Sequence, residues 1–129
     1  MRERGILLMN HLRHLTVVDK MVIFIETILQ NNNCLKEIEA NFSHNYPNYE
    51  VIFHTYIGLS VSEYINQARI MEAEKLLEHT TLDFKEIATR IGMNGYFEFM
   101  QLFKQVNGIS PSTYRNQLLK DLNLTTEEK

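Results

Sequence analysis

Two stretches of this sequence match one another position by position, so the chain is expected to contain two copies of one structural unit. In the 129-residue chain, four positions recur at an offset of 50: Phe53, Gly58, Ser60 and Tyr64 correspond to Phe103, Gly108, Ser110 and Tyr114. Upstream of them, residues 35–38 correspond to 84–87 at an offset of 49. The change of offset indicates a one-residue insertion in a loop between matched helices. Two copies are fewer than the three repeats that a solenoid needs.

The repeated unit is predicted to be two short helices joined by a tight turn. Apolar residues recur at helical spacing on both sides of Gly92: Ile87, Ala88 and Ile91 before it, and Phe99, Leu102 and Phe103 after it. Gly92 suits the turn, because a residue without a Cβ can leave a right-handed helix without a clash. This order of elements is the layout of a helix-turn-helix unit.

Helix start signals divide the rest of the chain. Ser60 with Glu63, and Asp83 with Glu86, form capping boxes, and Ser110 is followed by a proline suited to a first helical turn. Helices are predicted over 16–30 (with Thr16 as the N-cap), 35–41, 46–56, 60–79, from 83 to the turn at 92, 96–105 and 110–122.

The expected fold is therefore all-α, with two helix-turn-helix subdomains joined by a long linker helix and about seven helices. The expected parts are a basic N-terminal extension over 1–16 (Arg2, Arg4, Arg13), a first subdomain over 17–59, the linker helix over 60–79, a second subdomain over 80–122, and a tail over 123–129.

Composition excludes several functional classes. The single cysteine, Cys34, cannot form an internal disulfide and fits a reducing cytoplasm, the expected location. The apolar run near the start is too short for a signal sequence, and no stretch is long enough to cross a membrane. His11 and His14 lack the further ligands that a metal site needs, so no metal or other cofactor is expected. We also find no nucleophile triad, phosphate loop or carboxylate pair, which argues against an enzyme.

The repeat resembles the DNA-binding domain of the AraC/XylS family of bacterial transcription regulators. The resemblance covers residues 17–115 and is carried by Leu35, Ile38, Phe53, Gly58, Tyr64 and Arg69 in the first part, and by Ile87, Ala88, Gly92, Phe99, Phe103, Lys104, Gly108, Ser110, Pro111, Tyr114 and Arg115 in the second. It implies seven helices, with recognition helices over 46–56 and 96–105 that enter successive major-groove segments of promoter DNA, about one turn or roughly 34 Å apart. A chain of this length resembles the stand-alone members without a sensor domain. RNA polymerase and another regulator protein are further candidate partners.

The candidate base-reading residues are those expected on the outward faces of the two recognition helices: Tyr46, Glu50, Val51, Tyr96, Phe97, Met100 and Gln101, with Pro47 beside them. Neither face carries an Arg or Lys, which are the commonest partners of guanine. Gln101 is expected to read adenine and Glu50 to accept from a cytosine amino group, while the apolar residues would pack on thymine methyl groups. The candidate phosphate contacts are Lys20, Arg69, Arg90, Lys104 and Arg115, of which Arg69 and Arg115 suit a structural pairing equally well.

The unusual reading faces leave a second function open. Tyr96, Phe97 and Met100 form the kind of exposed apolar patch that binds protein, so the chain is also consistent with a protein-binding antagonist or co-regulator of the same fold. The chain has a net charge of -3, whereas a nucleic-acid-binding domain is usually basic. A protein that is acidic overall can nevertheless carry a local basic stripe. Glu39 occupies the position of Ala88. A buried unpaired carboxylate is costly, so either local opening of the fold or an outward turn of Glu39 is expected here.

Overall fold

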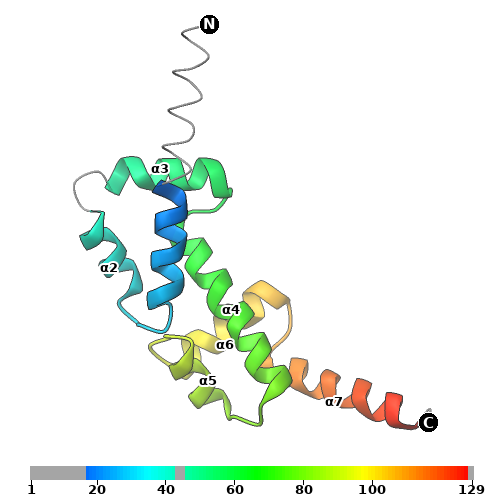
Figure 1. The fold of residues 1–129 in the computed structure, drawn as a ribbon. Coiled ribbons are helices and arrows are strands. Elements are labelled where there is room, and N and C mark those ends of the chain that lie inside the picture. Colours follow the sequence, from blue (N-terminus) through cyan, green and yellow to red (C-terminus); the bar gives the residue numbers. More distant parts are fainter. Residues whose placement is uncertain (1–16, 43–45, 128–129) are drawn as a thin grey trace, which may run out of the picture. The chain divides into compact units, whose positions relative to one another are not determined.

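The computed structural model describes residues 17–42 and 46–127, and the side chains of 17–42 and 48–122. Within these ranges the protein consists of seven helices and contains no strand, which confirms the all-α fold (Figure 1). The first helix covers 17–28 and is followed by α2 (Cys34–Asn41), α3 (Tyr46–Ile57), α4 (Val61–His79), α5 (Phe84–Arg90), α6 (Tyr96–Asn107) and α7 (Pro111–Glu127). The predicted N-cap Thr16, the basic start with its arginines, and His11 and His14 lie outside the described residues.

The chain divides into two compact units, each with its own apolar core. Among the described residues, the first unit contains 17–29 and 33–65, and the second contains 30–32 and 66–127. The first core consists of Val18, Met21, Ile25, Cys34, Ile38, Phe53, Val61 and Ile65. The second consists of Ile70, Ala73, Leu77, Ile87, Ala88, Ile91, Phe99 and Phe103. In the second core, five of the six apolar positions whose spacing around Gly92 predicted helices are buried, and the sixth, Leu102, is partly buried against it.

The internal repeat is reproduced in the backbone where α3 and α6 end. Gly58 has a φ of 85° and Gly108 a φ of 78°, in the left-handed region that glycine adopts without a Cβ penalty. The Gly58 amide donates to the His54 carbonyl at 2.9 Å, and the Gly108 amide donates to the Lys104 carbonyl at 2.7 Å. Helices α3 and α6 thus end in the same way.

The helices that follow these glycines also begin alike. The Ser60 hydroxyl accepts from the Glu63 amide at 3.1 Å, and the Ser110 hydroxyl accepts from the Thr113 amide at 3.2 Å. Each serine satisfies one amide of the first turn, which lacks a partner within its own helix. The predicted N-caps of α4 and α7 are confirmed.

One aromatic pair in each unit packs two consecutive helices together, α3 against α4 in the first unit and α6 against α7 in the second. The rings of Phe53 and Tyr64 lie 5.5 Å apart at 85°, and those of Phe103 and Tyr114 lie 5.5 Å apart at 78°. Both pairs are edge-to-face, the arrangement that the charge distribution of aromatic rings favours. Equivalent contacts therefore set the orientations of α3 and α6 against the helices that follow them.

The turn between α5 and α6 matches the predicted helix-turn-helix layout. The Asp83 carboxylate accepts from the Glu86 amide at 2.8 Å and caps α5. At the other end, the Gly92 amide donates to the Thr89 carbonyl at 3.1 Å, and the amide of residue 93 donates to the carbonyl of residue 88 at 3.0 Å. Gly92 has a φ of 84°, so this turn is a Schellman motif that ends α5 and directs the chain toward α6.

The two units differ where their sequences differ. Glu39 is exposed, whereas its counterpart Ala88 is 2% exposed and belongs to the second core. Of the two expectations for Glu39, the outward turn is confirmed. The last helix also differs from expectation, since α7 continues to Glu127 rather than ending at Leu122. The sequence after Pro111 contains no glycine or further proline, and nothing in it interrupts the helix.

Replacing Asn107 by isoleucine is expected to stabilise the second unit by about 1–2 kcal/mol. The Asn107 amide nitrogen is buried and has no hydrogen-bond partner among the described residues. The first unit has Ile57 at the equivalent position. Urea denaturation followed by circular dichroism measures the change. The matched control is Asn116→Ile on the exposed surface of α7, which should stay within about 0.5 kcal/mol of the original chain. A clear loss of stability in Asn107→Ile would contradict the prediction.

Candidate nucleic-acid interface

The outward face of α6 carries Phe97, the most exposed of the apolar base-reading candidates whose side chains the structure describes. Phe99 and Phe103 are fully buried on one side of this helix, while Phe97 on the other side is 76% exposed. Gln101 and Lys104 are exposed and follow Phe97 at intervals of four and three residues, so the three side chains form one stripe. The core contacts of α6 therefore determine which residues it presents to a partner.

A shallow hollow lies along this stripe. Its volume is about 270 Å³, its walls are almost entirely apolar, and it is lined by Tyr96, Phe97, Met100, Gln101, Lys104 and Ser110. We call it the α6 hollow. All four base-reading candidates that the sequence placed on α6 contribute to it, and Lys104, a phosphate candidate, lies at the same place. The structure thus brings these five predicted residues together.

The outward face of α3 is arranged differently. Val51 is 65% exposed, but Glu50 is half-buried and one of its carboxylate oxygens accepts from the Val61 amide at 3.1 Å. Because Val61 is the first residue of α4, the negative charge of Glu50 also faces the positive end of that helix. Glu50 thereby acts as a cap for α4, which is a role that its position in the sequence does not indicate. The side chain of Tyr46 lies outside the described residues.

His54 was not selected from the sequence, although the repeat points to it. It lies 50 positions before Lys104, in the last turn of α3, and its side chain is exposed. At the offset of 50, the α6 stripe of Phe97, Gln101 and Lys104 corresponds to Pro47, Val51 and His54. Applying the offset of 50 to exposed positions as well as to apolar ones would have identified His54.

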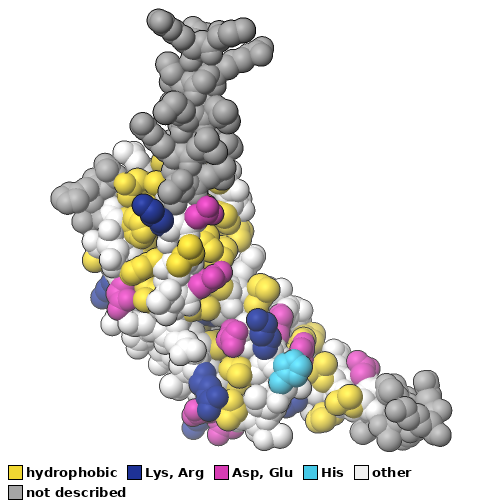
Figure 2. All heavy atoms as spheres, viewed as in Figure 1, with side chains coloured by type: hydrophobic (Ala, Val, Ile, Leu, Met, Phe, Trp, Pro, Cys, Tyr) yellow, Lys and Arg dark blue, Asp and Glu magenta, His cyan; other side chains and the backbone are white. Residues whose placement is uncertain are grey.

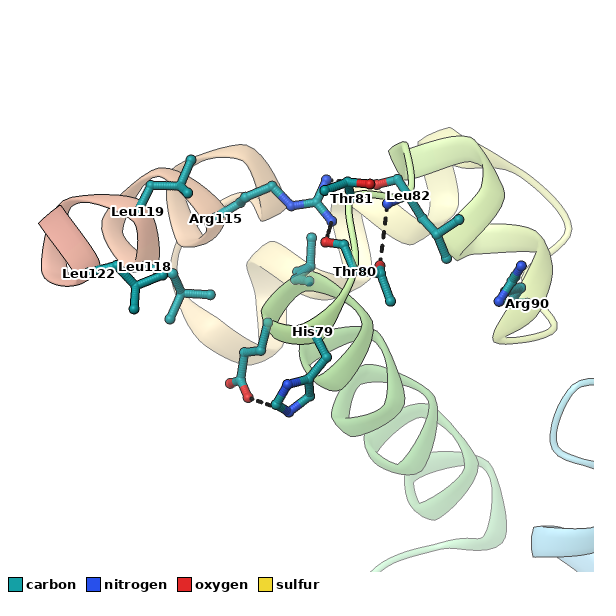
Figure 3. Close-up of a pocket in the computed structure, with 11 residues that line it drawn as sticks. His79, Thr80, Thr81, Leu82, Arg90, Arg115, Leu118, Leu119 and Leu122 are labelled. Atoms are coloured by element: carbon teal, nitrogen blue, oxygen red, sulfur yellow. Dashed lines mark hydrogen bonds and ion pairs between the residues drawn. The ribbon is translucent and has the colours of Figure 1, made fainter.

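Arg115 is held by internal contacts. Its guanidinium donates to the Leu82 carbonyl at 2.7 Å and to the Thr80 carbonyl at 3.2 Å, and its central carbon lies 5.4 Å from the centre of the Phe84 ring. Figure 3 shows the side chain reaching from α7 to the segment between α4 and α5. The surrounding groove, of about 790 Å³, is lined mainly by the end of α4, the middle of α7 and this segment. These contacts give Arg115 a structural role, although its partners are backbone carbonyls and a ring of the second unit rather than the acidic side chains that a structural pairing would use.

The remaining phosphate candidates differ in the contacts that their side chains make. The guanidinium of Arg69 donates to the Asn31 carbonyl at 2.9 Å. Arg90 forms an ion pair with Glu86, one turn away, at 3.2 Å. Lys20 and Lys104 have exposed side chains. Lys104 therefore combines exposure with a position on the α6 stripe.

The two tyrosines of the repeat remain protonated at neutral pH. The Tyr114 hydroxyl donates to a Glu78 carboxylate oxygen at 2.7 Å. Burial, this hydrogen bond and the charges of Glu78 and Glu74 together raise the pKa of Tyr114 to about 12. Burial and the charge of Glu26 also raise the pKa of Tyr64. Both hydroxyls therefore stay un-ionised at neutral pH, and that of Tyr114 acts as a hydrogen-bond donor within the fold.

Charges of both signs are interspersed on the face of the molecule that Figure 2 shows. Lys75 lies 3.9 Å from Glu72, and Arg90 is paired with Glu86 in the same manner. Exposed pairs of this kind contribute little to stability, and they reduce the positive potential around the lysine and arginine side chains. Across the described residues, no set of three His, Cys, Asp or Glu side chains could hold a metal ion. None of the described helices has the length and apolar character needed to cross a membrane.

Two helix-turn-helix units, each presenting one outward helix face, define a double helix-turn-helix protein. A model of the family described as "Helix-turn-helix domain" matches residues 42–117, which is more than half of the chain. The transcriptional activator AarP of Providencia stuartii is 31% identical over 100 residues, covering 78% of this chain and 74% of AarP. The chain belongs to the AraC/XylS family of helix-turn-helix transcription regulators.

Other relatives and solved structures also match the chain. The activator RhaR of Cronobacter sakazakii is 35% identical over 66 residues, but these cover 51% of this chain and 23% of RhaR. The C-terminal domain of AraT, a response regulator from Geobacillus stearothermophilus, superposes with a TM-score of 0.74 at 24% identity, covering 78% of this chain and 84% of that one. The DNA-binding domain of AdpA, solved with a target DNA, gives a TM-score of 0.72 at 20% identity, covering 78% and 90%. At these identities the two structures establish the shared fold.

Proposed function

We propose that this protein is a sequence-specific DNA-binding transcription regulator in which α3 and α6 are the reading helices. The observation that carries the proposal is the doubled unit. Helices α3 and α6 end in the same way, and each packs through an equivalent aromatic pair against a following helix that a serine caps. The similarity to AarP, which is named as a transcriptional activator, supports it. The role is non-catalytic and belongs in the bacterial cytoplasm, where promoter DNA is found.

In this proposal, double-stranded promoter DNA is the partner and each reading helix lies in a major groove. The groove is about 12 Å wide and admits one α-helix, with the exposed stripe toward the base edges. On α6, Gln101 offers an amide suited to adenine, and Lys104 a positive charge suited to a phosphate. Val51 and His54 are the corresponding residues on α3. RNA polymerase and another regulator are the proteins through which such a regulator would affect transcription.

Lys104→Ala is expected to weaken DNA binding by a similar factor on every sequence. Removal of one phosphate contact lowers the slope of log K against log salt concentration by about 0.9. Fluorescence anisotropy of a labelled 20–30 base-pair duplex, titrated at several salt concentrations, measures this slope. Lys120→Ala on α7 is the matched control, since it removes the same charge from another exposed helix. Equal effects of both substitutions would contradict the assignment of Lys104, and an absence of binding even at low salt would overturn the proposed function.

A second candidate function is favoured by the exposure of Phe97. An aromatic side chain that is 76% exposed beside an apolar hollow also suits a protein partner, and the molecule would then act as an antagonist or co-regulator. The two functions differ in what Phe97→Ala does. If the protein is a DNA-binding regulator, Phe97→Ala should change its affinity for DNA. If it is a protein-binding antagonist or co-regulator, Phe97→Ala should abolish association with another regulator and leave DNA binding unchanged.

A further inference from the structure

The walls of the α6 hollow restrict what can bind there. Phe97 and Met100 contribute apolar surface, and Tyr96 is 37% exposed at the start of the helix. The hollow offers few polar atoms, so a phosphate or the acceptor-rich edge of guanine would lose more hydrogen bonds to water than it gained. An apolar group of small size is the better occupant.

Charge determines the class of partner. Lys104 lines the hollow together with uncharged residues, and no acidic side chain of the described part of the chain contributes to it. A groove with apolar walls and one cation at its rim complements a surface on which small apolar groups lie beside negative charges. Duplex DNA presents such a surface in its major groove, where the 5-methyl group of thymine is the apolar group on the base edges and phosphates flank it.

Gln101 adds a polar contact to this arrangement. It lies one turn after Phe97 on the exposed stripe and lines the same hollow. A glutamine amide can donate to N7 and accept from N6 of adenine, which no other base matches. A thymine methyl group in the hollow and an adenine at Gln101 are therefore compatible with neighbouring A·T pairs.

We propose that α6 selects A·T base pairs by burying thymine 5-methyl groups in the hollow formed by Tyr96, Phe97 and Met100. This inference rests on the proposed function, because it assumes that α6 faces DNA. The selectivity arises from the apolar walls, so it does not need the arginine–guanine contact that both reading faces lack. Lys104 holds the phosphate backbone beside the hollow and contributes affinity without sequence preference.

Replacement of thymine by deoxyuridine tests this proposal, because it removes the methyl group and leaves base pairing intact. Two 24 base-pair duplexes of one A·T-rich sequence are compared by anisotropy at low salt, one with thymine and one with deoxyuridine throughout. The thymine duplex should bind about fourfold more tightly for each methyl group buried, the factor that corresponds to burial of one such group. Phe97→Ala should bring the two affinities close together, mainly by weakening binding to the thymine duplex.

The matched control is Val106→Ala, which truncates an exposed apolar residue on another side of α6. It should preserve the thymine preference. Equal binding of the two duplexes by the unaltered protein would overturn the inference while leaving DNA binding intact, and the hollow would then be available to a protein partner. A uniform loss on both duplexes in Phe97→Ala would also overturn it, since the contact would not involve the methyl group. Failure to bind either duplex at low salt would instead remove the proposed function itself.

Discussion

Phe103→Ala is expected to lower the free energy of unfolding of the second unit by about 3–5 kcal/mol. The Phe103 side chain is fully buried, and its ring lies 5.9 Å from that of Phe99 and 5.5 Å from that of Tyr114. Alanine leaves a cavity between α6 and α7 that the surrounding side chains cannot fill completely. Because a whole domain is typically stable by about 5–15 kcal/mol, this loss removes much of the stability of one unit. Urea denaturation monitored by circular dichroism measures it.

The same residue type on the same helix provides the control. Phe97 is 76% exposed, so Phe97→Ala should change the free energy of unfolding by about 0.5 kcal/mol or less. Phe103→Leu keeps most of the buried volume and should give an intermediate loss in a protein that remains folded. Equal losses at positions 97 and 103 would contradict the division of α6 into a core face and a reading face.

Arg115→Ala is expected to lower the free energy of unfolding by about 2–3 kcal/mol, through the loss of hydrogen bonds made by a charged group. Its guanidinium donates to the Leu82 and Thr80 carbonyls and lies over the Phe84 ring, so the substitution removes the contacts that connect α7 to the segment before α5. Thermal or urea denaturation measures the loss. Arg115→Lys should recover a small part of it, because an ammonium group lacks the planar fork that reaches both carbonyls.

Arg90→Ala is the matched control for this prediction. Arg90 is exposed and forms an ion pair with Glu86 one turn away, a contact that contributes about 0.3–0.5 kcal/mol. Arg115→Ala should also leave the salt dependence of DNA binding unchanged under conditions where the protein is folded. A stable Arg115→Ala protein with a lower salt slope would identify Arg115 as a phosphate contact instead.

The parts of the fold that could be predicted from sequence are those determined by local chemistry. Gly92 and Gly108 mark positions where the backbone adopts positive φ, and Ser110 marks a helix start, because each property belongs to one residue and its immediate neighbours. The apolar spacing of α6 similarly identified Phe99 and Phe103 as core residues. Comparison of the two repeats strengthened the interpretations of Phe103, Gly108 and Ser110, which have identical counterparts in the first copy.

The contacts that the sequence did not reveal join residues far apart in the chain. Glu50 caps α4 through the amide of residue 61, and Arg115 binds carbonyls 33 and 35 positions before it. Such pairings depend on how the helices pack, and many acidic or basic residues would fit them equally well by sequence alone. The unpaired amide of Asn107 has the same origin, since only the packed structure shows that its nitrogen is buried.

The base-reading residues remain predictions for a further physical reason. Exposure shows that Phe97 and Gln101 are accessible, but sequence preference depends on the groove that receives them and on its deformability. The α6 hollow adds the information that the accessible surface is apolar, which the sequence indicated only as a set of residue types. This apolar surface supports our proposal that α6 reads the methyl-bearing face of A·T pairs.

Selection from a pool of randomised duplexes, carried out at a low and at a physiological salt concentration and followed by sequencing, tests the central claim most directly. Two reading helices in one chain should enrich a bipartite motif whose halves lie about one helical turn apart. One half should be rich in A·T pairs, and Phe97→Ala should weaken the preference in that half. No enriched motif at either salt concentration, with binding lost at physiological salt, would contradict the account.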